Sequence, residues 1–235
     1  MLVDDDVLID CGSGVGDLTL DEMANIRHVF LTHSHLDHVA FLPLLVDSIF
    51  ERIQEPIVIH GLPATIQALR EHIFNWAIWP DFAKLPVVNK PVMAYQEHSA
   101  GDICYVNGRK FESIQMNHIV PTVGYRVESA EGKSFAFTGD TSTNDTFWQV
   151  LNGYSGLDLL LLEVAFSNEY EELSNNARHY CSKTMVEDLV KLNLDPEIYL
   201  THHKPEENNQ ILDEIKELLP AREIKQLKNN QRFSL

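Results

Sequence analysis

The sequence predicts an α/β fold. Short apolar segments of strand length alternate with stretches of helical apolar spacing along most of the 235 residues, which is the pattern of strand–helix units. Several of these apolar segments end in Gly, His or Asp. The hydrophobic fraction of 44% suits a chain with a sizeable core. No repeat, low-complexity tract or linker is evident, so residues 1–235 are expected to form a single domain.

In the first half of the chain, apolar runs and helical spacing alternate in order. Leu42, Leu45, Val46, Ile49 and Phe50 recur at the spacing of one helix face. A proline near the start of the next helical stretch suits a first turn. The elements expected are a strand at 7–10 ending in a glycine turn at 11–14, a strand at 28–31, a helix at 39–53, a strand at 56–60 and a helix at 63–74.

In the second half, hairpin signals come first and strand–helix units follow. Asn107-Gly108 between two apolar runs favours a type I′ turn. The nearly continuous apolar run at 157–166 is typical of a central strand covered on both faces. The elements expected are hairpins at 103–116 and 122–138, a central strand at 157–166, a helix at 182–193, a strand at 197–201 and a helix at 208–219.

Composition narrows the function. The formal net charge of −17 argues against a protein that coats nucleic acid, because phosphate contacts need a basic surface. Cys11, Cys104 and Cys181 are far apart and form no C-x-x-C pair, so neither a disulfide framework nor a zinc knuckle is expected. The first ten residues lack the pattern of a signal peptide, and no apolar run approaches bilayer length. A cytoplasmic protein without a membrane partner is therefore expected.

The segment 33–38, His-Ser-His-Leu-Asp-His, carries four potential metal ligands directly after an apolar strand. Imidazole and carboxylate groups are costly to bury unless they are hydrogen-bonded, paired or bound to a metal. A loop at the end of a rigid strand is a suitable place for a preorganised metal site. We therefore expect this segment to bind metal.

Three further candidate ligands also follow apolar strands. His118 comes after the strand that ends at 117, Asp140 follows Gly139, and His202 follows the strand 198–201. Ligands placed repeatedly just beyond strand ends would form a site along one edge of a sheet.

The ordered set of H-x-H-x-D-H, a lone His, Gly-Asp-Thr and a late His resembles the metallo-β-lactamase superfamily over nearly the whole chain. The resemblance implies an αββα sandwich and two divalent metal ions. Zinc is expected, with manganese or iron as alternatives. The implied ligands are His33, His35 and His118 for one ion, Asp37, His38 and His202 for the other, and Asp140 bridging both.

Two ligand positions exclude relatives with other chemistry. A β-lactamase-type second site usually has Cys where Asp140 stands, and the redox di-iron relatives replace His35 with Glu. The resemblance therefore implies a hydrolase in which a hydroxide held between the metals attacks the substrate.

Within the superfamily, three segments resemble the class II cyclic-nucleotide phosphodiesterases. They are the motif 33–38 with Leu between the second His and the Asp, the segment 72–81 with its Ile-Phe-Asn and Ile-Trp-Pro elements, and the loop 201–205. The resemblance implies hydrolysis of a small phosphodiester, a 3′,5′-cyclic nucleotide such as cAMP or cGMP, to the 5′-monophosphate. Phe74, Asn75 and Trp79 are substrate-contact candidates through base stacking, with core packing as the alternative.

Three alternatives stay open at this point. A tRNA 3′-end processing endonuclease of the RNase Z type is supported by the strand 162–166 followed by His179. The net charge opposes it, as does the short separation of His118 and Asp140, which are only 22 positions apart. A glyoxalase II-type thioesterase shares the ligand set but lacks an evident basic cluster. A catalytically silent metal-bound interaction module would lose ligand residues, and all seven positions are intact.

Beyond metal binding, four residues are candidates for roles in the reaction or in orienting the ligands. Asp37 is expected to bind metal and to orient the attacking group. His179 is a candidate to meet the phosphoryl charge or to protonate the leaving group, with a solvent-exposed loop histidine as the alternative. Glu163, at the end of an apolar strand, is expected to orient a ligand histidine. His203 is a further candidate that either folds back toward the site or faces solvent.

Only six residues precede the strand at 7–10, so we expect that the sandwich lacks a leading strand, that the given start is late, or that a neighbouring subunit covers this edge. An uncovered edge strand can pair with another chain. A homodimer is therefore expected.

Overall fold

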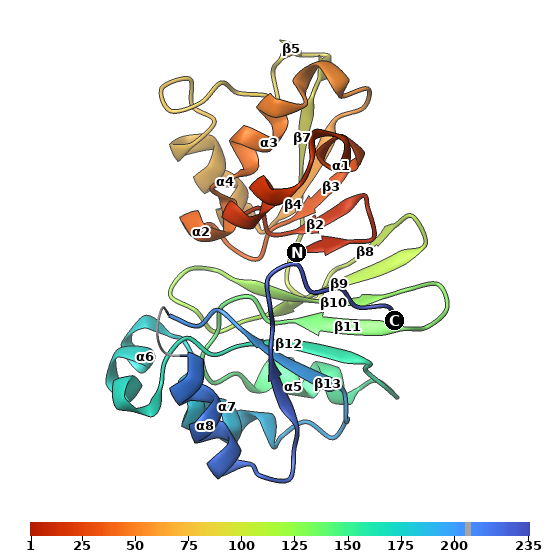
Figure 1. The fold of residues 1–235 in the computed structure, drawn as a ribbon. Coiled ribbons are helices and arrows are strands. Elements are labelled where there is room, and N and C mark those ends of the chain that lie inside the picture. Colours follow the sequence, from red (N-terminus) through yellow and green to blue (C-terminus); the bar gives the residue numbers. More distant parts are fainter. Residues whose placement is uncertain (205–207) are drawn as a thin grey trace. The chain divides into compact units, whose positions relative to one another are not determined.

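The computed structural model of the chain describes residues 1–204 and 208–235. The chain divides into two compact units, residues 1–99 (red to yellow in Figure 1) and residues 100–235 (green to blue). The expectation of a single domain stays a prediction. Among the described residues, every helix is too short or too polar to cross a bilayer.

The N-terminal unit is built on a five-stranded sheet in the order β1-β2-β3-β4-β7. β2, β3, β4 and β7 are parallel, and β1 is antiparallel to β2. The carboxyl ends of the four parallel strands therefore lie at one edge of the sheet. The strands are β1 (Leu2–Val3), β2 (Val7–Ile9), β3 (His28–Phe30), β4 (Ile57–Gly61) and β7 (Met93–Glu97), with a separate small hairpin of β5 (Pro86–Val87) and β6 (Lys90–Pro91).

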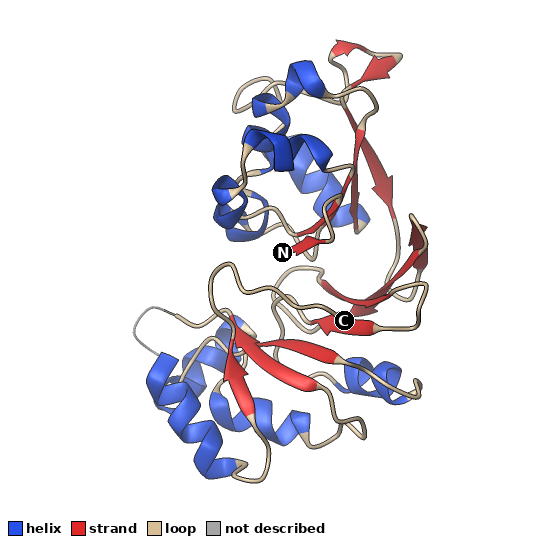
Figure 2. Cartoon of the chain, turned by 45° about the vertical axis from the view of Figure 1, so that its right-hand side comes forward, coloured by secondary structure: helices blue, strands red, loops and turns tan. Residues whose placement is uncertain are grey.

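Helices cover one face of this sheet (Figure 2). Met23, Leu45 and Leu69, from three of the helices, join strand residues such as Ile59 in one buried apolar cluster. This burial holds the sheet rigid behind the loops at its edge. The helices are η1 (Ser13–Asp17), α1 (Leu20–Asn25), α2 (Leu36–Val39), α3 (Leu42–Ser48), η2 (Phe50–Arg52) and α4 (Pro63–His72).

The predicted continuous helix at 39–53 is wrong, because the segment is divided into α2, α3 and η2. Pro43 has no N–H to donate to the carbonyl of Val39, and its ring would clash with that carbonyl in a continuous helix. Instead, the backbone N–H of Phe41 donates to the carbonyl of Cys11 at 2.9 Å. The break leaves α2 as a separate short helix that carries Asp37 and His38.

The C-terminal unit is built on a seven-stranded sheet in the order β14-β13-β12-β11-β10-β9-β8. Strands β8 to β11 are antiparallel neighbours, whereas β11 to β14 are parallel. The strands are β8 (Ile103–Val106), β9 (Arg109–Gln115), β10 (Val123–Glu128), β11 (Ser134–Phe137), β12 (Leu159–Glu163), β13 (Glu197–Thr201) and β14 (Ile224–Gln226), and the helices are α5 (Asp145–Asn152), η3 (Asn168–Tyr170), α6 (Glu171–Ala177), α7 (Ser182–Leu189) and α8 (Asn208–Leu218).

The topology of the second sheet explains why its candidate site residues can meet. β9 and β11 are both antiparallel to β10, so they run in the same direction, and β12 and β13 are parallel to β11. The carboxyl ends of these four strands therefore share one edge. His118, Asp140 and His202 follow three of the ends, and Glu163 is the last residue of the fourth. β12 is fully buried and central, as predicted.

A buried carboxylate, Asp188, ties α7 to α5. It accepts hydrogen bonds from the hydroxyl of Tyr180 (2.6 Å), the backbone N–H of Asn144 (2.8 Å) and the ammonium of Lys191 (2.6 Å). Burial alone would raise the pKa of Asp188, but these bonds and one from an indole N–H hold it below its ordinary value.

Replacing Asp188 with alanine is expected to lower the free energy of unfolding by about 3–5 kcal/mol, because several donors lose their buried acceptor. Since the folded-state pKa of Asp188 is lowered, its contribution is present above the unfolded-state pKa and is lost as pH falls through the folded-state value. Urea unfolding at neutral and acidic pH measures both effects. The control is Asp145→Ala, which removes an exposed carboxylate from the same Lys191 ammonium and should change the free energy of unfolding by under about 1 kcal/mol. Equal losses of unfolding free energy in both variants would contradict the structural role of Asp188.

A short leading strand is present. β1 pairs antiparallel with β2, so β1 is the edge strand on that side of the sheet. The expectation of a homodimer stays a prediction.

Candidate functional site

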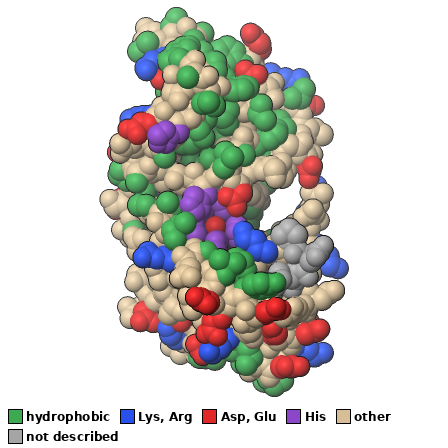
Figure 3. Space-filling model, turned by 90° about the vertical axis from the view of Figure 1, so that its left-hand side faces the viewer, with side chains coloured by type: hydrophobic (Ala, Val, Ile, Leu, Met, Phe, Trp, Pro, Cys, Tyr) green, Lys and Arg blue, Asp and Glu red, His purple; other side chains and the backbone are tan. Residues whose placement is uncertain are grey.

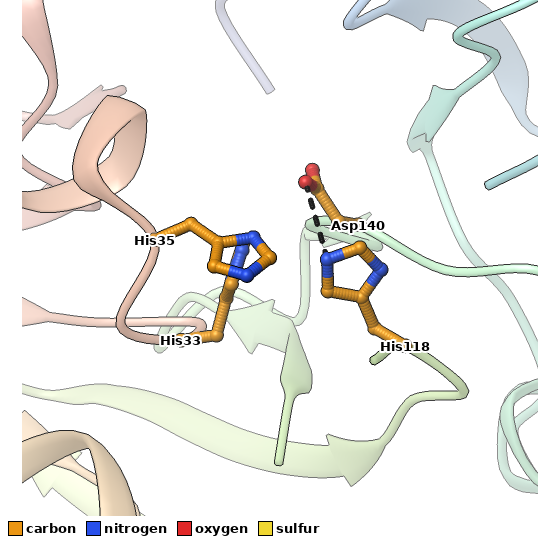
Figure 4. A group of neighbouring side chains, drawn as sticks. All are labelled: His33, His35, His118 and Asp140. Atoms are coloured by element: carbon orange, nitrogen blue, oxygen red, sulfur yellow. Dashed lines mark ion pairs between the residues drawn. The ribbon is translucent and has the colours of Figure 1, made fainter. Parts of the chain in front are cut away.

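The loop after β3 gathers the predicted ligands of the N-terminal unit. The rings of His33 and His35 lie side by side (Figure 4), with their centroids 4.6 Å apart. The ring of His38 lies 4.2 Å from that of His33. His33 and His38 are buried, whereas the carboxylate side chain of Asp37 is 63% exposed and lies 3.7 Å from Nε2 of His38. The four side chains that the motif predicts are therefore brought together within this unit.

Asp10, at the end of the neighbouring strand β2, orients this loop. Its carboxylate accepts hydrogen bonds from the backbone N–H of Thr32 (2.8 Å) and from Nδ1 of His38 (2.7 Å). The hydroxyl of Thr32 lies 3.0 Å from the same carboxylate and 2.9 Å from Nδ1 of His33. A carboxylate that binds Nδ1 fixes the tautomer and the ring orientation, so that Nε2 is the atom that can bind metal.

The sequence interpretation did not assign a role to Asp10. The available signal was an acidic residue at the very end of a buried strand. Its importance depends on β2 lying beside β3 in the sheet, which the sequence pattern alone does not specify.

Replacing Asp10 with alanine is expected to weaken metal binding by about 10–100-fold, because His38 loses the partner that orients it. Metal content measured after dialysis against a competing chelator checks this. Asp5→Ala, in the exposed turn before β2, is the matched control and should leave retention unchanged. Retention by Asp10→Ala equal to that of the unmodified chain would show that Asp10 acts only on folding.

Gly12 lets the turn after β2 approach the ligand loop, the segment 33–38 that carries the four candidate ligands of this unit. A Cβ atom at this position would lie 2.1 Å from the backbone carbonyl oxygen of Asp37, which is far inside contact distance. The backbone N–H of Cys11 donates to the carbonyl of His38 at 2.7 Å. The glycine turn predicted at 11–14 thus supports the ligand loop directly.

In the C-terminal unit, a buried carboxylate lies between two imidazoles. Asp140 Oδ1 is 3.3 Å from Nδ1 of His202, and Asp140 Oδ2 is 3.9 Å from Nε2 of His118 (dashed in Figure 4). Nδ1 of His118 donates to the carbonyl of Arg178 at 2.9 Å. Nε2 of His118 is therefore the ring nitrogen directed at Asp140. The three predicted ligands of this unit lie together.

Glu163 and His179 form a buried pair beside these ligands. Oε1 of Glu163 accepts from the backbone N–H of Thr141 (2.9 Å) and from Nδ1 of His179 (2.8 Å). The ring of His179 stacks on that of His202 at 5.3 Å and meets that of His118 at 4.8 Å. Burial and the nearby Asp140 carboxylate raise the pKa of Glu163 well above its ordinary value. Glu163 therefore orients His179. The sequence interpretation had instead predicted that Glu163 orients a histidine that binds metal.

His203 turns toward the backbone just beyond the end of β12. Its Nδ1 donates to the carbonyl of Val164 at 2.8 Å, and burial lowers its pKa. Of the predicted loop 201–205, Pro205 lies outside the described residues. A substrate role for His203 stays a prediction.

The aromatic segment after α4 packs mainly within the N-terminal unit. Phe74 is buried in the apolar core, and Trp79 packs against the same core. The side-chain amide of Asn75 donates to the carbonyl of Glu71, and its oxygen accepts from the backbone N–H of Ile78. These contacts account for all three residues structurally, and their role as substrate contacts stays a prediction.

Comparisons with known proteins agree with this fold. A 3′,5′-cyclic-nucleotide phosphodiesterase of Aliivibrio fischeri is 28% identical over 164 residues, which are 63% of this chain and 48% of that protein. A ribonuclease Z of Bradyrhizobium sp. (strain ORS 278) is 27% identical across 93% of this chain and 87% of that protein. The crystal structure of unliganded yeast PDE1 matches with a TM-score of 0.77 at 20% identity, over 89% of this chain and 69% of that one.

The chain spans about half the length of the Aliivibrio phosphodiesterase. The match to yeast PDE1 supports the predicted metallo-β-lactamase fold. Residues 6–203 match the family described as beta-lactamase superfamily domain, so the chain belongs to that superfamily.

Proposed function

We propose that this chain is a dinuclear metal-dependent phosphodiesterase that hydrolyses 3′,5′-cyclic nucleotides to 5′-monophosphates. The observation that carries the proposal is Asp140, a buried carboxylate placed between His118 and His202 with the Glu163–His179 pair beside them. A bridging carboxylate surrounded by imidazoles is the donor arrangement that a two-metal hydrolase needs.

The donor set fits divalent transition metals. One ion would be held by His33, His35 and His118, and the other by Asp37, His38 and His202, with Asp140 shared. Five imidazoles, two carboxylates and no thiolate favour zinc, with manganese or iron as alternatives. Hydrogen bonds from Nδ1 of His38 and of His118 to fixed acceptors within each unit orient these rings as metal-binding histidines are normally oriented. When bound, the ions would supply Lewis acidity toward the phosphoryl group and lower the pKa of a bound water.

The protein's own residues would handle the proton and the leaving group. Asp37, exposed on the short helix α2, would orient the attacking water. As the P–O3′ bond breaks, His179 would deliver a proton to the departing 3′ oxygen, leaving a 3′ hydroxyl and a 5′-monophosphate. Glu163 would hold the imidazole of His179 in position for that transfer through the 2.8 Å bond to Nδ1.

The substrate class rests on the three segments that resemble class II phosphodiesterases and on the Aliivibrio relative bearing that name. The test is an assay of the metal-reconstituted chain with cAMP, cGMP, bis(p-nitrophenyl) phosphate and precursor tRNA. Hydrolysis of at least one cyclic nucleotide is the expected result. Hydrolysis of the generic diester with neither cyclic nucleotide turned over would overturn the substrate assignment while leaving the metal-dependent hydrolase standing.

A second candidate is tRNA 3′-end processing. The ribonuclease Z relative favours it, because the match spans 93% of this chain and 87% of that protein. The net charge of −17 opposes it, since tRNA binding depends on cationic contacts to phosphate. Cleavage of precursor tRNA at a rate above that of either cyclic nucleotide would make this the better assignment.

A further inference from the structure

A cavity lies within the N-terminal unit, at the edge strand β7. It has a volume of about 410 Å³ and is bounded by the last turn of α4, the segment after that helix and β7. Among the described residues that line it, none is a candidate metal ligand. This volume falls in the range of small-molecule binding sites.

One wall of the cavity carries an uncompensated cation. The guanidinium carbon of Arg70 lies 4.6 Å from the centre of the Tyr95 ring. Within the part of the chain that the structure describes, no hydrogen bond or ion pair engages this guanidinium. The other lining cation, Lys84, is already paired with Asp81 at 2.8 Å. Arg70 therefore presents free, planar donors suited to a carboxylate or a phosphate.

The same cavity carries aromatic surface. The side chain of Trp76 is 59% exposed. Hydrophobic side chains also gather on the face of this unit that Figure 3 shows. Trp76 has a left-handed backbone with φ of 68°, held by its N–H bond to the carbonyl of Trp79 at 2.9 Å. Phe74 lines the cavity from the core. The buried hydroxyl of Tyr95 has no hydrogen-bond partner among the described residues.

We propose that this cavity binds a small organic anion that carries a planar ring. The guanidinium of Arg70 binds the anionic group, and the indole of Trp76 stacks on the ring. Both an aryl carboxylate and a nucleoside monophosphate have this chemistry. None of the candidate metal ligands lines the cavity, whereas Phe74 and Asn75, two of the predicted substrate contacts, do.

The test is titration of the metal-loaded full chain with benzoate, 5′-AMP and inorganic phosphate. The Kd is read from the shift of the Trp76 indole N–H signal in ¹H–¹⁵N NMR, assigned with Trp76→Phe, so that anion binding at the metal ligands is not counted. At least one ring-bearing anion should shift that signal. Arg70→Gln should weaken its binding by at least about tenfold, and phosphate, which lacks the ring, should bind more weakly than that anion.

Arg52→Gln is the matched control, because its guanidinium pairs with Asp21 outside the cavity, and it should leave the Kd unchanged. Binding of benzoate alone would assign the carboxylate, and binding of 5′-AMP alone would assign the phosphate. Failure of both anions to shift the Trp76 signal, or an equal Kd in Arg70→Gln, would overturn the proposal.

Discussion

Replacing Asp140 with asparagine is expected to reduce turnover of bis(p-nitrophenyl) phosphate by about 10³-fold and to lower the metal content of the chain. Asparagine keeps the shape of the side chain but removes the charge that a ligand shared by two cations provides. A loss of several kcal/mol of metal-dependent stabilisation corresponds to a rate effect of this size. Activity and metal content by atomic emission measure the two effects on the same preparation.

The matched control for Asp140→Asn is Asp158→Asn. Asp158 lies before β12 in the same unit, and its carboxylate pairs with Lys133 at 2.8 Å, away from the candidate ligands. Its neutralisation should leave turnover and metal content unchanged. A fully loaded and fully active Asp140→Asn variant would remove Asp140 from the metal site, and with it the two-metal mechanism.

Turn residues and apolar spacing in the sequence made much of this fold predictable. Asn107 and Gly108 both have positive φ, 48° and 82°, as a type I′ turn requires, and β8 and β9 flank them as expected. The helix predicted at 182–193 ends earlier, at Leu189. There the backbone N–H of Lys191 donates to the carbonyl of Asp188, three residues back, and the Lys191 ammonium bonds the Asp188 carboxylate, which tightens and ends the last turn.

The elements that the sequence interpretation missed are short or lie at edges. α5 begins at an asparagine cap, Asn144, whose side chain accepts from the N–H of Phe147, but the helix is only eight residues long. β7 is an edge strand with a half-exposed pattern, so its apolar alternation is weak. Periodicity is a strong signal only where a whole face is buried.

The candidate site was predictable because its residues follow strand ends. That rule finds His118, Asp140 and His202 without any knowledge of the sheet order. It cannot find the role of Asp10 or the partner of Glu163, since both depend on which strands and loops are neighbours. How a ligand side chain is oriented depends on the tertiary structure, whereas the residue types that can bind metal are visible in the local sequence.

The pairing of Glu163 with His179 predicts a second large effect. His179→Ala is expected to lower turnover of a cyclic nucleotide by about 10²-fold or more while metal content stays intact, because the leaving 3′ oxygen loses its proton donor. Glu163→Gln should also lower turnover of the cyclic nucleotide while metal content stays intact, since the amide no longer holds the His179 imidazole in the same tautomer. The double variant should be little worse than the more impaired single variant, as is usual for residues that act as one unit.

The choice of substrate separates proton donation from a structural role. p-Nitrophenolate leaves without protonation, so both variants should lose much less activity on bis(p-nitrophenyl) phosphate than on the cyclic nucleotide. A merely structural defect would lower both activities together. His72→Ala is the control, because this histidine at the end of α4 is 76% exposed and far in the chain from either residue. Equal losses on the two substrates would leave the Glu163–His179 pair a scaffold for the neighbouring ligands rather than the source of the proton.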